Sequence, residues 1–184
     1  MLRPKVAIAL LIVACATVPA VRQNPDDEHA VFAAILADPY TFDAPGMREH
    51  PALADLTDLH EYLQRWPRDG EVSELCELEF KGGGCTAVPR ELPRLLTQVN
   101  QKPTTVGDLG LRTVHLSQWS EIPPGVTRIL VLSKPAIDSQ GTRALIAIRR
   151  VYPQPNFGPD GFMVYLEKHG GIWHVIRHGA QWIV

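Results

Sequence analysis

The sequence predicts an α+β domain in which amino-terminal helices pack on a carboxyl-terminal antiparallel sheet. The first observation is that apolar residues recur at helical spacing in the first half of the chain. The second is that the last third holds four apolar runs of strand length, joined by connections too short for a crossover, which require antiparallel neighbours. The helices are therefore expected to cover one face of the sheet.

The first helix is expected between Asn24 and Pro39. Asn24 suits the N-cap position, Pro25 suits the first helical position, and the acidic residues 26–28 lie where the helix dipole is positive. Four apolar residues then form one stripe: Val31, Phe32, Ile35 and Leu36. The proline at position 39 ends the pattern.

Two further amphipathic helices are expected before residue 101. Apolar residues spaced three or four apart run from Leu53 to Trp66 and stop before Pro67. A similar register predicts another helix from about Pro89 to Asn100.

The stretch ELCELEFKGGGC is expected to form a hairpin closed by a disulfide. Residues 71–80 alternate weakly, as a strand does, and would place Cys76, Leu78 and Phe80 on one face. If Cys85 lies on the returning strand after the three glycines, it can pair with Cys76. Such a bridge would stabilise the fold by roughly 2–3 kcal/mol.

Four runs predict the antiparallel sheet: RILVLSK, RALIAIRRVY, GFMVYLEK and IWHVIRH. Only His169, Gly170 and Gly171 separate the last two, which predicts a tight hairpin. We expect residues 24–184 to form a single domain.

The amino terminus predicts an export signal. Arg3 and Lys5 precede an apolar run from Val6 to Ala14, which is close to the roughly 7–15 residues of a signal-peptide core. A membrane-spanning helix needs about 20 apolar residues, so this run is too short to span a bilayer. Residues 1–14 are then the signal peptide and residues 15–23 a short tether.

Two cleavage sites remain open. The residues Ile12 to Cys15 resemble the lipobox of bacterial lipoproteins, which implies that Cys15 carries lipid and begins the mature chain. Ala16 follows it, and by the same resemblance this favours the outer membrane, facing the periplasm, in a Gram-negative cell. A conventional signal peptidase could instead cut after Ala20 and release a soluble protein.

Cysteine count and charge limit the function classes. The chain has three cysteines, and lipidation or removal of Cys15 leaves one pair, which suits an oxidising compartment. The 18 basic and 20 acidic side chains give a formal net charge of −2 and form no basic stripe, so no nucleic-acid partner is expected.

The motifs predict no catalytic centre, no cofactor and no metal site. The serines lack the G-x-S-x-G elbow, and glycines 82–84 lack the lysine and hydroxyl of a phosphate loop. His174 and His178 have a zinc-like spacing, but on a strand they would lie roughly 13 Å apart.

Weak binding candidates come from one loop and one sheet face. The proline-rich loop 152–161 presents Tyr152 and Phe157 between two strands. His115, Tyr165 and His174 are the candidate polar residues of a pocket.

The last third resembles a family of uncharacterised bacterial exported proteins. The matching segments are LS at 132–133, ALI at 144–146, GIWHV at 171–175 and WI at 182–183. The order of elements is similar to the cystatin-like, nuclear-transport-factor-like roll, in which helices pack against a curved antiparallel sheet. The resemblance implies export and that fold, but no reaction, because the fold hosts enzymes and binding proteins alike.

The expected function is that of an exported, lipid-anchored envelope protein with a non-enzymatic binding domain. Its partners would be the membrane, through the amino-terminal lipid, and an envelope protein or peptide. The alternative is a soluble secreted small-ligand binder or hydrolase that uses a pocket on the concave sheet face, with cleavage after Ala20.

Overall fold

The computed structural model describes residues 24–42, 51–55, 72, 74–76, 84–115, 122, 124–153 and 160–183. The helices are α1 (Pro25–Ala37), α2 (Pro39–Phe42) and α4 (Glu91–Val99). The strands are β1 (Pro51–Ala54), β2 (Glu74–Cys76), β3 (Cys85–Ala87), β4 (Arg112–Val114), β5 (Arg128–Leu132), β6 (Ala136–Ile137), β7 (Arg143–Val151), β8 (Asp160–His169) and β9 (Ile172–Ile183).

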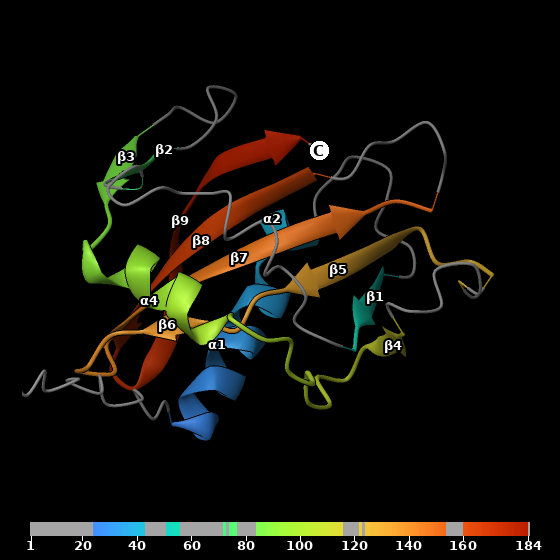
Figure 1. The fold of residues 1–184 in the computed structure, drawn as a ribbon, viewed down its shortest axis with the longest axis horizontal. Helices are drawn as coiled ribbons and strands as arrows, with labels where there is room; N and C mark the ends of the chain where they lie inside the picture. The colour runs from blue at the N-terminus through green and yellow to red at the C-terminus, as the bar shows by residue number, and fades with distance from the viewer. Residues whose placement is uncertain are drawn as a thin grey trace, which may run out of the picture.

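One seven-stranded mixed sheet organises the molecule (Figure 1). Its order is β4-β1-β5-β7-β8-β9, and the short strand β6 pairs with β7 beside this path. Strand β1 is parallel to both β4 and β5, whereas β5, β7, β8 and β9 form an antiparallel series. Strands β2 and β3 form a separate two-stranded antiparallel sheet.

The expected fold class is wrong. The protein is mostly β, its main sheet is mixed rather than antiparallel, and its strands come from the first half of the chain as well as the last third. The chief error lies at Leu53, which was expected to open the second helix but belongs to strand β1 and pairs with Thr113 and Leu130. A short apolar run fits both helical and strand periods, and pairing with β5 decides between them. Residues 56–71, where the rest of that helix was expected, lie outside the described part of the chain.

The central strands are buried on both faces, which also contradicts the expectation that helices cover one face. In β7, Leu145 and Ala147 join one apolar cluster, while Ile146 and Ile148 join the other. The first cluster contains Leu92 and Leu96 of α4 and the second contains Val31, Phe32 and Ile35 of α1. The two helices therefore lie on opposite faces of the sheet (Figure 1). Burial on both faces explains why β5 and β7 read as nearly continuous apolar runs.

The first helix and the third expected helix are confirmed. The side chain of Asn24 caps α1 by accepting a hydrogen bond from the backbone N–H of Asp26 at 3.2 Å. Helix α4 buries Leu92 and Leu96 completely. None of the described helices is long and apolar enough to cross a membrane.

The β8–β9 hairpin is confirmed and controls where its histidines lie. Gly170 and Gly171 adopt positive φ angles of 59° and 84° in the two-residue turn, which glycine adopts without strain. His174 pairs with Glu167 and His178 pairs with Val164, and the register shifts between the two pairs. This β-bulge puts the two histidines on opposite faces of the sheet, because directly paired residues share a face and Glu167 and Val164 face opposite ways.

Candidate functional site

A charged pair, Arg150 and Asp160, is buried on the sheet face that α1 covers. The two residues are direct partners on β7 and β8, and the Arg150 guanidinium donates to the carboxylate at 2.8 Å from Nε and 2.5 Å from Nη2. The arginine side chain is only 6% exposed. Burial alone would lower the pKa of Arg150, but the hydrogen bonds and charge of Asp160 outweigh it and raise the pKa above its ordinary value. Arg150 therefore keeps its charge despite its burial.

Aromatic rings surround this pair. The Arg150 guanidinium lies 4.8 Å from the ring centre of Phe162 and 6.0 Å from that of Tyr40, within the range of cation–π attraction. Tyr40 packs edge-on against Phe162 at 5.4 Å and lies 4.3 Å from the ring of His178. We call these residues, Arg150, Asp160, Tyr40, Phe162 and His178, the Arg150 cluster.

His178 connects the Arg150 cluster to the end of α1. Its Nε2 lies 2.8 Å from a carboxylate oxygen of Asp38, the residue that follows α1. Burial acts to raise the pKa of Asp38, but the hydrogen bond and charge of His178 and two hydrogen bonds from Thr41 lower it below its ordinary value. The contact fixes α1 and α2 against β9.

A second buried arginine lies beside the cluster. Arg128 of β5 is 1% exposed, and its Nη1 donates to the backbone oxygen of Thr41 at 3.5 Å. Its guanidinium lies 5.6 Å from the centre of the Tyr152 ring. The Tyr152 hydroxyl donates to Asp160 at 3.5 Å, and burial raises the pKa of this tyrosine. The sequence predicted that Tyr152 contacts a ligand from the loop after β7. In the structure, its side chain instead contacts the charged residues Arg128 and Asp160.

A polar cluster of a different kind lies at the turn end of β8 and β9. The hydroxyl of Tyr165 donates to Glu167 Oε1 at 2.8 Å, and the other oxygen of Glu167 lies 3.2 Å from His169 Nε2. The rings of His169 and His174 are 5.9 Å apart. We call these four residues the hairpin cluster. Burial and the bond to Glu167 raise the pKa of Tyr165, so its hydroxyl keeps its proton and acts as a donor.

A third pair lies at the far side of the sheet. His115 Nδ1 lies 2.5 Å from a carboxylate oxygen of Asp55, where strands β4 and β1 end. The His115 side chain is 67% exposed. Because β4 and β9 are at opposite ends of the strand order, the sheet separates His115 from Tyr165 and His174. The predicted pocket that would unite these three residues is not formed by the described residues.

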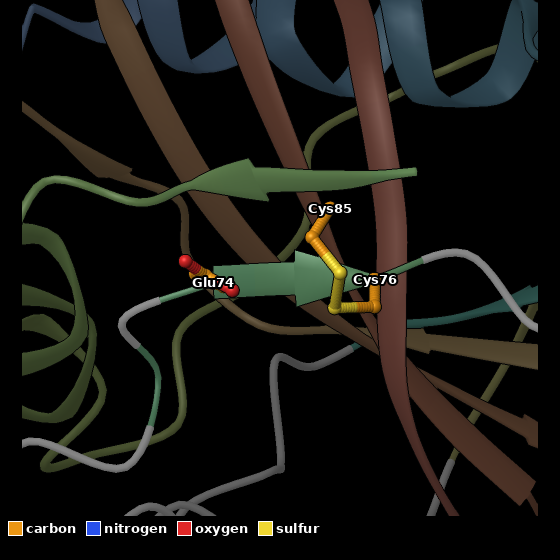
Figure 2. Close-up of side chains that lie close together, drawn as sticks. All are labelled: Glu74, Cys76 and Cys85. Carbon is orange, nitrogen blue, oxygen red and sulfur yellow. A yellow bond between two sulfur atoms is a disulfide. The ribbon is translucent and has the colours of Figure 1, made fainter. Parts of the chain in front are cut away.

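The predicted disulfide between Cys76 and Cys85 is confirmed (Figure 2). The two cysteines are direct partners in the antiparallel β2–β3 hairpin, with Cα atoms 4.0 Å apart. Glu74 lies close to the bridge, and its carboxylate and the two sulfurs fall within 4.8 Å of one another. Disulfide sulfurs are not thiolates, so the oxidised hairpin offers a metal ion only the carboxylate.

The described residues also line an open groove between α4 and the turn after β6. Its volume is about 550 Å³. Its lining carries both signs of charge and one apolar side chain: Arg90, Glu91, Arg94, Leu95, Gln98, Asp138 and Ser139. We call it the α4 groove.

Sequence reasoning missed the charged residues that matter most to these clusters. Arg150 lies two residues after Ile148 and four after Ile146, so it is on the strand face that α1 covers. This spacing could have identified it as a buried charge that needs a partner. His169 and Glu167 could have been associated with His174 from the two-glycine turn alone. Cys15 and Phe157 lie outside the described residues.

Comparisons with protein-family models, with curated protein sequences and with solved structures each found no match to this chain. The resemblance to bacterial exported proteins therefore stays a prediction.

Proposed function

We propose that the protein is an exported domain, anchored to the membrane through lipid on Cys15, that binds an envelope protein or peptide and does not catalyse a reaction. The observation that carries this proposal is the Cys76–Cys85 disulfide. Disulfides persist in the periplasm and outside the cell and are rare in the reducing cytosol. A bridge between two exposed cysteines is therefore best explained by export.

The amino-terminal segment supports export to an oxidising compartment, where the disulfide can form. The apolar run Val6–Ala14 ends at a lipobox-like cysteine, and α1, the first described helix, starts ten residues later at Pro25. Several acyl chains give a stable anchor, whereas a single chain gives only marginal binding. A tether of this length would hold the domain near the membrane surface.

Binding is favoured over catalysis because the partly buried carboxylates of the sheet and of α1 are held in structural contacts. Asp160 is held by Arg150, Asp38 by His178, and Asp27 by Lys168. The buried hydroxyl of Ser133 donates to the backbone oxygen of Lys134 and accepts from the N–H of Ala147. Apolar packing on both faces of β5 and β7 also disfavours the alternative pocket on the sheet face.

The anchor is tested in cells that export the protein. A Cys15→Ser variant should lose incorporation of radiolabelled palmitate and accumulate as unprocessed precursor, while the wild type fractionates with membranes. Mass spectrometry of the mature wild-type chain should find modified Cys15 as its first residue.

Cys76→Ser is the matched control, since it removes a cysteine without touching the leader, and it should keep the label. A soluble product of the wild type that begins at Val21 would contradict the lipid anchor and support the secreted alternative.

The binding part of the proposal is tested at the α4 groove. A photo-crosslinking amino acid in place of Gln98 should give a defined crosslinked product in the membrane fraction, and the added variants Arg90→Glu and Arg94→Glu should abolish it. The same crosslinker in place of Thr113, an exposed residue of β4 at the other end of the strand order, is the control. Equal crosslinking from both positions would contradict a specific partner at the groove.

A further inference from the structure

We propose that His169, His174 and Glu167 form a binding site for a divalent transition-metal ion such as Zn²⁺ or Cu²⁺. This inference does not depend on the proposed export or on the α4 groove. The site combines His174 with Glu167 and His169, which the β8–β9 hairpin places beside it. His178 is not part of the site, because it lies on the other face of the sheet.

The backbone places the three donors together. Glu167 and His174 are direct cross-strand partners, so their Cβ atoms lie about 5 Å apart. His169 is two residues beyond Glu167 on β8 and therefore projects from the same face. The two-residue glycine turn and the paired strands fix this arrangement without help from any flexible loop.

Two of the three donors are already in contact, and the third needs a side-chain rotation to join them. His169 Nε2 is 3.2 Å from Glu167 Oε2, and the rings of His169 and His174 are 5.9 Å apart. Two imidazoles bound to one zinc ion have ring centres about 5 Å apart, given metal–nitrogen bonds of about 2 Å. The His169 side chain is 62% exposed, so its rotation can close the difference while the backbone stays in place.

Tyr165 orients the carboxylate for this role. Its buried hydroxyl donates to Oε1 of Glu167, which leaves Oε2 directed toward His169. Partners of this kind fix the orientation of a ligand, and their loss commonly weakens metal binding by about 10–100-fold. Tyr165 is thus a positioning residue.

Ligand chemistry decides the class of ion. Two imidazoles and one carboxylate suit Zn²⁺, Cu²⁺ and Ni²⁺, whereas Ca²⁺ and Mg²⁺ prefer sets of oxygen ligands. Arg143, the partner of Glu167 on β7, is a nearby cation that opposes binding. Lys168 points to the other face, where it binds Asp27.

The test is titration of the purified, oxidised protein with Zn²⁺ by isothermal calorimetry, without reductant so that the disulfide stays closed. The wild type should bind one ion. His169→Gln and His174→Gln should each weaken binding by at least about tenfold, and Tyr165→Phe should weaken it by about tenfold with the fold unchanged.

His115→Gln and His29→Gln are matched controls, because both remove an exposed imidazole elsewhere, and both should bind like the wild type. Cu²⁺ provides a second readout: its electron paramagnetic resonance spectrum should show two coordinated nitrogens in the wild type and one in His174→Gln. Zinc affinity that is equal in the wild type and the His169→Gln, His174→Gln double variant would overturn the proposal.

Discussion

At the scale of single residues, the sheet face under α1 depends on how its buried charges are paired. Arg150 and Asp160 occupy neighbouring strands, and the carboxylate is the partner that keeps the 6% exposed arginine side chain ionised. Removing one member of a buried pair leaves the other charge without compensation, whereas replacing both by apolar side chains removes the problem.

We therefore expect Asp160→Asn to lower the free energy of unfolding by about 3–5 kcal/mol. The double variant Arg150→Met, Asp160→Leu should be closer to the wild type, because the Arg150 guanidinium is then removed together with its partner, while the Tyr152 hydroxyl still loses its acceptor and Arg128 stays buried nearby. Urea denaturation followed by far-ultraviolet circular dichroism measures both. Glu91→Gln, an exposed carboxylate change on α4, is the control and should cost less than about 0.5 kcal/mol. A double variant as unstable as the single one would contradict this account.

At the scale of elements, the β2–β3 hairpin is short and stands apart from the main sheet. Each strand has three residues, and such isolated hairpins are marginal in water. Two features hold it in place: the disulfide and its contact with β9, where the Cβ position of Gly179 would lie 2.9 Å from backbone atoms of Cys76. Only glycine allows this close approach without displacement.

The double variant Cys76→Ser, Cys85→Ser should lose roughly 2–3 kcal/mol of stability, because the unfolded chain regains the freedom of the closed loop. Thermal denaturation of the wild type with a dithiol reductant should reproduce the shift, and the double variant should be indifferent to the reductant. A wild type whose melting temperature does not respond to complete reduction would show that the bridge is dispensable.

At the scale of the whole molecule, α1 is fastened to the sheet at both ends by carboxylates. Asp27 in its first turn accepts from Lys168 at 2.5 Å and from the Trp173 indole N–H at 3.3 Å, while Asp38 after its last turn contacts His178. The Lys168 hydrogen bond is the main cause that lowers the pKa of Asp27, and the contacts of Asp38 lower its pKa against the effect of burial. These attachments join the start and end of one helix to β8 and β9.

The lowered pKa values predict acid sensitivity. Each carboxylate contributes stability that is fully present above the ordinary aspartate pKa of 3.8 and is lost as pH falls through the lower pKa of the folded state. Urea midpoints measured between pH 6 and pH 2.5 should fall steeply at the acid end for the wild type. The midpoints should fall less steeply for the double variant Asp27→Asn, Asp38→Asn. The control variant Asp26→Asn should behave like the wild type. If the urea midpoints of all three proteins fell equally at low pH, Asp27 and Asp38 would not be the cause of the acid sensitivity.

The sequence by itself determined the elements whose signals are local. The caps and stripe of α1, the register of α4, the hairpin disulfide and the four carboxyl-terminal strands all follow from spacing, capping and turn chemistry within about 20 residues. Only the tertiary structure decided that β1 is a parallel strand, that both sheet faces are covered, and that a β-bulge separates His174 from His178. The same holds for the contact of Arg150 with Tyr40 and of His178 with Asp38. The physical reason is that pairing partners and burial are set by residues distant in the chain, so the same apolar stretch near Leu53 becomes helix or strand according to what lies beside it.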